Sequence, residues 1–215
     1  MPDRPQRCCC KALRRGLLGL LCVVGALVAF CWFDREAVLR SAADAWIVSD
    51  APGPADAAAI FGGGIEDRPF AAARYYRQGL VKKIVISNVG SGPAERLGVL
   101  DPYVAANRNV LLKLGVPEAD IGVFGANLTN THQEAVALHE WARAQDVHSI
   151  IIPTEPFGTR RLRWVLAREF NGDASFRVVG TDYRDVRPDN WWKTDIGILS
   201  FQNEIIKYIY YRLKY

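Results

Sequence analysis

The chain has 215 residues, half of them hydrophobic, and a formal net charge of +4. This length suits one folded domain with an additional segment. Residues 1–15 carry five basic residues against one acidic residue, and the rest of the chain carries 22 of each, so the excess charge belongs to the N-terminal tail. Because a nucleic-acid partner requires a basic surface on the domain, we exclude nucleic-acid binding.

The segment after this basic tail has the pattern of a membrane anchor. Residues 16–33 contain no charged side chain and end on Trp32 and Phe33. As a helix, these 18 residues span about 27 Å, close to the hydrocarbon thickness of a bilayer. The basic tail predicts a single-pass protein of the cytoplasmic membrane, with its N-terminus inside and its domain outside. The alternative is a cleaved signal peptide, whose apolar region is shorter and ends in small residues.

All five cysteines lie in this N-terminal segment. Cys8, Cys9 and Cys10 precede the predicted span, and Cys22 and Cys31 lie within it. The domain therefore offers no disulfide, thiol nucleophile or thiolate metal ligand. The three adjacent cysteines could be acylated or could remain unmodified cytosolic thiols, and the sequence leaves both alternatives open.

The rest of the sequence predicts one α/β domain. Residues 34–54 read as a helical neck and a turn-rich linker, and the domain occupies 55–215. Apolar runs predict buried strands at 56–61, 83–87, 121–124, 149–153 and 176–180. Helical patterns follow them at 69–78, 102–114, 131–145, 159–170 and 191–213. Continuous apolar strands favour a Rossmann-like, doubly wound, mostly parallel sheet of about five strands.

Ligands of such sheets bind beyond the carboxyl ends of the strands. We therefore expect one shared rim, formed by the loops at 62–68, 87–95, 125–131 and 154–161. Gly62, Gly63 and Gly64 end the first strand. Glycines at this position let a ligand approach the backbone and expose amide groups to an anion. The alternative is a tight turn that needs positive φ, and the pattern is no dinucleotide fingerprint.

Two arginines begin the helix that follows the fourth strand. The spacing of the apolar residues in this helix places Arg160 and Arg161 in its first turn, where cations oppose the helix dipole. A bound anion would offset this cost, because free amides and guanidinium groups would hold it together. The alternatives are a pair with Glu155 or a solvated face. We predict anion binding.

Three glutamates are the available acids or bases, namely Glu66, Glu134 and Glu155. Thr131 and Glu134 fit a capping box at a helix start, a structural role that is sufficient to explain both residues. Asn130 precedes them and is expected at the rim. Because the three histidines lack metal-ligand spacing, we predict no metal site.

The C-terminal stretch, residues 191–215, is rich in aromatic residues. Most of them are expected to pack the last helix onto the sheet. The final residues, YIYYRLKY, also suit contact with lipid headgroups, and for this tip both interpretations stay open.

Taken in order, these residues resemble the YdcF/SanA/ElyC-like family of bacterial envelope proteins, from about residue 56 to residue 211. The resemblance rests on DAAAIFGGGIEDR, RYYRQGLVKKIVISN, LLKLGVPEADI, NTHQEA and IIIPTEPFGTRRLRW. It implies a Rossmann-like sheet behind one membrane helix and a role in cell-wall or envelope biogenesis, near polyprenyl-carrier or peptidoglycan metabolism. S-adenosylmethionine is a possible ligand by this resemblance alone, and we predict no other cofactor.

The chain departs from the family pattern at two places. Gly158 stands where family members carry a histidine, and Gln133 and Glu134 stand where they tend to have Glu-Asn. The resemblance implies ligand binding by Gly62, Gly63, Gly64, Arg68, Asn130, Thr131 and Arg161.

We expect a membrane-anchored envelope protein that binds an anionic ligand, phosphorylated or polyprenyl-linked, at the rim, as a hydrolase or transferase. The alternatives are a non-catalytic binding or assembly module and an S-adenosylmethionine or nucleotide binder. The sequence leaves open whether a reaction is catalysed, which protein partners it has and its oligomeric state.

Overall fold

A computed structural model describes the backbone of residues 6–181 and 186–215, and their side chains except those of residues 6–14, 26, 27 and 31. The chain divides into two compact units, one up to Ala42 and one from Ala43 to Tyr215. The acylation considered at Cys8, Cys9 and Cys10 concerns side chains outside this description, and residues 1–5 of the basic tail also lie outside it.

The first unit consists of helix α1 (Gln6–Phe33) and most of helix α2 (Arg35–Trp46). The apolar segment predicted at 16–33 is thus helical, and apolar side chains such as Leu17 and Val28 are more than half exposed. Within the described residues, no single helix is both long and apolar enough to cross a membrane. Arg15–Phe30 and Arg35–Trp46 meet that requirement only together, as a bent pair, by length and composition. The membrane anchor stays a prediction.

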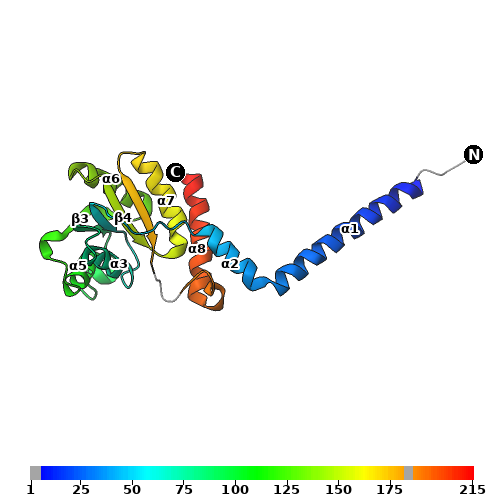
Figure 1. Cartoon of the computed structure of the whole chain (residues 1–215), viewed down its shortest axis with the longest axis horizontal. Helices are drawn as coiled ribbons and strands as arrows, with labels where there is room; N and C mark the ends of the chain where they lie inside the picture. The colour runs from blue at the N-terminus through cyan, green and yellow to red at the C-terminus, as the bar shows by residue number, and fades with distance from the viewer. Residues whose placement is uncertain (1–5, 182–185) are drawn as a thin grey trace, which may run out of the picture. The chain divides into compact units, whose positions relative to one another are not determined.

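The second unit is built on a five-stranded parallel sheet with the order β3-β2-β1-β4-β5 (Figure 1). The strands are β1 (Ala57–Ile60), β2 (Lys83–Val89), β3 (Ile121–Leu128), β4 (Ser149–Thr154) and β5 (Ser175–Gly180). The register pairs Ala58 of β1 with Ile84 of β2 and with Ile151 of β4. The sheet confirms the predicted α/β fold and all five predicted strands. It is parallel throughout.

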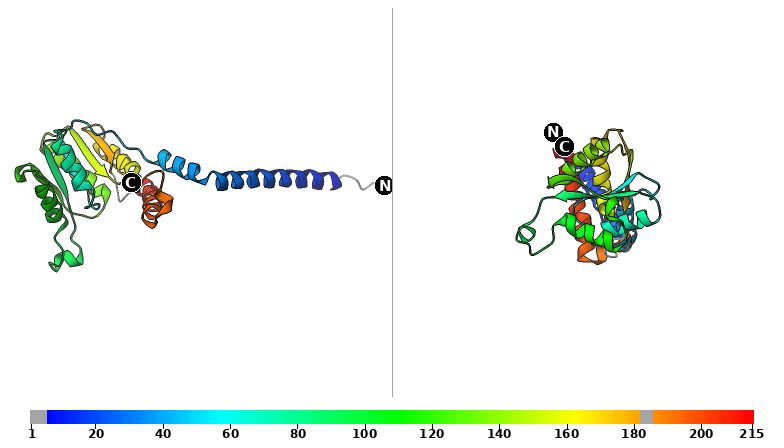
Figure 2. Two further views of the ribbon diagram at one scale, coloured as in Figure 1. Left: turned by 60° about the horizontal axis from the view of Figure 1, so that its bottom comes forward. Right: turned by 90° about the vertical axis from the view of Figure 1, so that its left-hand side faces the viewer.

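Helices cover both faces of this sheet (Figure 2). Helices α3 (Arg68–Arg77) and α5 (Tyr103–Lys113) lie on one face, and α6 (Thr131–Ala144) and α7 (Thr159–Phe170) lie on the other. Helix α8 (Asp195–Lys214) packs beside α7. The short elements are α4 (Pro93–Arg96), η1 (Glu118–Asp120), η2 (Pro156–Gly158) and η3 (Trp191–Lys193). The last helix was predicted to begin at residue 191. It begins at Asp195 instead, because the Thr194 hydroxyl accepts a hydrogen bond from the Gly197 amide and caps the helix there.

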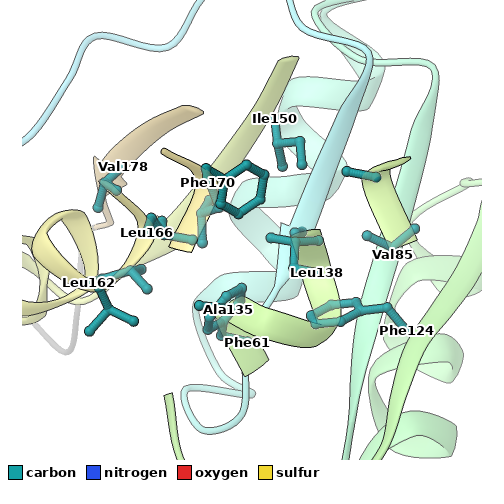
Figure 3. Packing of buried hydrophobic residues seen from close by; sticks show 14 of the residues in the cluster. Phe61, Val85, Phe124, Ala135, Leu138, Ile150, Leu162, Leu166, Phe170 and Val178 are labelled. Carbon is teal, nitrogen blue, oxygen red and sulfur yellow. The ribbon is translucent and has the colours of Figure 1, made fainter. Parts of the chain in front are cut away.

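The core forms two layers because successive side chains of a strand point to opposite faces. Ala58 and Ile60 of β1 face α3 and α5, whereas Ala59 faces α6 and α7. In the second layer, Leu138 of α6 and Phe170 of α7 pack against the sheet (Figure 3). The sheet is buried on both sides, which explains why its strands read as continuous apolar runs.

The end of α2 belongs to the second unit, which therefore begins at Ala43, before the predicted boundary at residue 55. The Trp46 indole donates to the backbone carbonyl of Phe157 at 2.9 Å. Its ring lies edge-on to Phe201 and Tyr208 of α8, with centroids 5.8 and 5.5 Å apart. These contacts fix the entry of the chain into the domain next to α8.

Leu138→Ala should lower the free energy of unfolding by about 2–5 kcal/mol, because it leaves a cavity in a fully buried layer. Leu112→Ala on α5 removes the same atoms from a side chain that is 40% exposed and should cost less than about 1 kcal/mol. Denaturant unfolding of the full chain in mild detergent measures both. Equal losses would contradict this assignment of the core.

Candidate functional site

A pocket of about 960 Å³ opens at the carboxyl edge of the sheet. The four loops predicted to share one rim all contribute to it, through Gly62 after β1, Gly90 after β2, Thr129 after β3 and Glu155 after β4. The strand order changes direction between β1 and β4, which is where open α/β sheets bind ligands. Helix α8 forms one wall of the pocket, a role that was not predicted from the sequence.

The turn after β1 requires glycine residues. Their backbone conformation favours glycine, and the neighbouring atoms leave little room for a side chain. Gly63 and Gly64 have φ of +93° and +54°, in the left-handed region. A Cβ atom on Gly62 would lie 2.6 Å from a Val89 methyl group, and one on Gly64 would lie within 3 Å of three charged side chains. The interpretation as a tight turn is therefore correct. Gly62 and Gly63 also line the pocket, whereas Gly64 is not part of its lining.

A buried ion pair joins this turn to the loop after β4. Nη2 of Arg68 lies 2.5 Å from Oε2 of Glu155, and Nη1 donates to the carbonyls of Phe61 and Gly62 at 2.9 and 2.6 Å. Burial opposes ionisation of Glu155, but Arg68 prevails and holds the pKa of this carboxyl below its usual value. Arg68 and Glu155 thus both reach the pocket, already paired with each other.

The predicted capping box at the start of α6 is wrong by one residue. Asn130 is the N-cap, and its side chain accepts from the Gln133 amide at 3.1 Å. Thr131 is the first helical residue. Asn caps a helix as well as Thr does. With Asn130 as the N-cap, the side chain of Glu134 is not needed for capping. Glu134 turns toward β1, where its Oε1 accepts from the Gly62 amide at 2.5 Å.

Glu134 is the acidic residue of the pocket whose carboxyl has a raised pKa. Only 5% of the residue is exposed, and burial raises the pKa of its carboxyl, while the Gly62 amide opposes the rise. The buried hydroxyl of Ser87 has no hydrogen bond of normal geometry, yet it lies near enough to Glu134 to oppose the rise as well. A carboxyl of this kind keeps its proton at a higher pH than a surface glutamate does.

A second ion pair crosses the pocket from α7 to α8. Nε and Nη2 of Arg161 donate to the two carboxylate oxygens of Glu204 at 2.7 and 3.1 Å, and Nη1 donates to the Thr131 hydroxyl at 2.6 Å. Lys207 also lies 3.1 Å from Glu204. Burial opposes ionisation of Glu204, but Arg161 and Lys207 hold its pKa below the usual value. The Arg161 guanidinium also lies over the Tyr211 ring.

Besides Gly64, three predicted site residues differ from expectation. Arg160 lies outside the pocket lining, because its guanidinium donates to the carbonyls of Ala45 and Trp46 at the end of α2. Neither Arg160 nor Arg161 pairs with Glu155, which belongs to Arg68. Glu66 is exposed and also lies outside the pocket lining. Asn130 lines the pocket, but its side-chain oxygen is occupied as the helix cap.

Gly158, at the position of the family histidine, is buried at the pocket wall. A Cβ atom there would lie 3.1 Å from the Thr154 hydroxyl, 3.7 Å from Glu155 Oε2 and 4.0 Å from the Glu204 carboxyl carbon. A side chain at this position would therefore begin between the two carboxylates. Glycine leaves that space to the pocket.

Glu204 and Asp67 are two buried acidic residues that were not predicted as site residues from the sequence. Glu204 lies on the buried stripe of α8 with Gly197, Phe201, Tyr208 and Tyr211, and a glutamate at that helical spacing was the available signal. Asp67 accepts from the Thr181 hydroxyl at 2.7 Å, and burial raises the pKa of its carboxyl. Nothing in its sequence context distinguishes it from a surface residue of the turn.

The pocket carries three basic and three acidic groups. The basic groups are Arg68, Arg161 and Lys207, and the acidic groups are Glu134, Glu155 and Glu204. Protonation of Glu134 leaves a net positive charge, since the other two carboxyls have lowered pKa values. The arrangement can therefore attract an anion and present it with a proton donor. In the part of the chain that is described, no group of three His, Cys, Asp or Glu side chains could hold a metal ion.

Glu134→Gln should raise the melting temperature of the protein near neutral pH by a few degrees. The variant keeps the acceptor for Gly62 but removes a charge whose burial is unfavourable. Because the folded pKa of Glu134 lies above its usual value of 4.5, wild-type stability falls as pH rises from about 4.5 to that pKa. The difference between the variant and the wild type should therefore grow with pH over this window. Thermal melts across a pH series measure it, and a variant less stable at high pH would contradict the assignment.

Comparisons of the chain with models of known families, with curated proteins and with solved structures find no match. The resemblance to the YdcF/SanA/ElyC-like family therefore stays a prediction. Function has to be inferred from the pocket.

Proposed function

We propose that this is a membrane-anchored envelope protein with a role in cell-wall or envelope biogenesis, whose pocket binds an anionic ligand that is phosphorylated or polyprenyl-linked. The observation that carries the proposal is Glu134, a buried carboxyl with a raised pKa at the base of a pocket that also holds Arg161 and Lys207. Such a carboxyl takes up a proton more readily than an exposed glutamate does, and in its protonated form it does not repel an anion.

The two ion pairs have different roles in this proposal. Arg68 is buried and holds the glycine turn, so it shapes the pocket. Arg161 and Lys207 share Glu204 at the pocket wall, and Lys207 is half exposed. An incoming phosphate competes with Glu204 for these two cations. Binding of the anion therefore depends on Arg161, and the shape of its site depends on Arg68.

As a hydrolase or transferase, the protein would use Glu134 as general acid or base. A protonated Glu134 donates its proton to a leaving oxygen, and the carboxylate then accepts one from the attacking water or hydroxyl group. Its bond from the Gly62 amide holds the carboxyl in place during both steps. Glu155 is a poorer candidate, because Arg68 keeps it ionised.

The proposed location rests on the N-terminal segment. Residues 16–33 carry no charge, follow a basic tail and form a helix with exposed apolar side chains. This pattern supports a membrane anchor with the α/β domain on the outer side of the cytoplasmic membrane.

A second candidate is a non-catalytic binding or assembly module of the envelope. It is favoured by the full pairing of Arg68 and Arg161 with carboxylates and by Gly158, which offers no acid or base where the resembled family has a histidine. S-adenosylmethionine or a nucleotide is a third ligand class, supported only by the family resemblance and the strand order.

Farnesyl phosphate should raise the melting temperature of the full chain in dodecyl maltoside by a few degrees at ligand concentrations well above Kd, since ligands that bind only the folded state stabilise it. Arg161→Ala should abolish this shift, because it removes the cation that receives the phosphate. Arg160→Ala, one residue away and outside the pocket, should keep it. Thermal melts of the three proteins measure the effect.

Farnesol, which lacks the phosphate, and S-adenosylmethionine serve as further ligands in the same melts. An equal shift with farnesol would contradict anion recognition, and a persistent shift in Arg161→Ala would contradict the role of that residue. Stabilisation by S-adenosylmethionine alone would support the third ligand class. No shift with any ligand would favour the assembly module.

A further inference from the structure

Helix α8 carries six exposed apolar side chains on the side that faces away from the domain, interrupted by the exposed Gln202. Its inner side packs on the domain through Phe201 and Tyr211. Its outer face, defined here by Ile198, Leu199, Ile206, Ile209, Tyr210 and Leu213, is between 41% and 84% exposed. An exposed apolar stripe of this length on a folded domain indicates a contact surface.

Basic and tyrosine side chains border this outer face. Lys207 and Lys214 lie along one edge and Arg212 lies along the other, all exposed. Lys214 donates to the Tyr210 hydroxyl at 2.8 Å, and Arg212 donates to the Tyr208 hydroxyl at 3.1 Å. Apolar stripes bordered by basic residues and tyrosines are typical of helices that lie in a lipid headgroup layer. The basic border is complementary to anionic headgroups.

The chain enters the domain at the same helix. The Trp46 ring contacts Phe201 and Tyr208 of α8, and the segment proposed as the membrane anchor continues from this point toward the N-terminus. The start of the second unit thus contacts α8, whereas α5 lies on the opposite face of the sheet.

The pocket opens along the same helix. Leu199 and Tyr210 belong both to the outer face and to the pocket lining, and Lys207 lies between them in the lining. A ligand that leaves a lipid layer at α8 therefore meets apolar side chains first and then the charged groups of the pocket.

We propose that the outer face of α8 rests on the anionic lipid surface of the membrane and that the pocket receives its ligand directly from that surface. The substrate class is then an amphiphile with an anionic head and a lipid tail that stays in the membrane. This inference rests on the proposed function for the ligand's anionic head, whereas the lipid contact of α8 is independent of it.

Photo-crosslinking tests the surface on the full chain. The protein is reconstituted in vesicles of roughly three parts phosphatidylcholine to one part phosphatidylglycerol. Benzoylphenylalanine replaces Ile206, Leu213 or, as the matched control on α5, the exposed Leu112. Positions 206 and 213 should form lipid adducts at more than about ten times the yield of position 112, because their side chains are inserted among lipids.

Two results would overturn the proposal. Adducts between two copies of the chain at position 206, without lipid adducts, would make the outer face a self-association surface. Lipid adducts no more frequent than at position 112 would place this face away from the membrane.

A charged variant tests delivery of the ligand. Ile206→Glu combined with Leu213→Glu alters the outer face but no residue of the pocket lining. Binding of farnesyl phosphate should be unchanged in dodecyl maltoside but at least about tenfold weaker when the ligand is presented in vesicles, since each lost apolar contact counts against membrane docking. Leu112→Glu should bind as the wild type in both settings.

The experiments distinguish failure of ligand delivery through α8 from failure of the proposed anionic ligand. If the wild type binds farnesyl phosphate and the double variant binds it equally well from vesicles, delivery through α8 is wrong and the proposed function stands. If the wild type fails to bind it in detergent and in vesicles, the anionic ligand is wrong, and crosslinking still decides the membrane contact.

Discussion

The Arg68 guanidinium is the group on which the pocket depends, because it satisfies two strand-end carbonyls and one carboxylate at the same time. It joins the turn after β1 to the loop after β4, the two central strands between which the sheet changes direction. A buried arginine without its partner would cost several kcal/mol, so the pair constrains both loops. Glu134 adds a third connection, from α6 to Gly62.

Charge compensation determines what this pocket can bind. Arg68 and Arg161 each face a carboxylate with a lowered pKa, whereas Glu134 has a raised pKa and faces a backbone amide. The proton on Glu134 therefore decides the net charge of the pocket. One buried carboxyl is thus expected to link ligand affinity to pH and, if a reaction occurs, to proton transfer.

Helix α8 has three roles, each carried by a different set of its residues. Its inner side completes the core, its Glu204 completes the second ion pair, and its outer face is apolar and exposed. Trp46, near the start of the second unit, contacts the same helix. If the proposed ligand is lipid-borne, the pocket has to lie beside the membrane, and α8 is the element that we propose places it there.

The sequence by itself determined the fold class, the five strands and the shared rim, because apolar runs, glycine breaks and helical spacing are local signals. Only the tertiary structure decided which group each charged side chain meets. Arg68 and Glu155 are 87 residues apart, Gly62 and Glu134 are 72 apart, and Arg161 and Glu204 are 43 apart. Nothing local separates Arg160, which binds backbone carbonyls, from Arg161, which enters the pocket. Such partners depend on packing, since a pair of charges is stable only where burial and geometry bring it together.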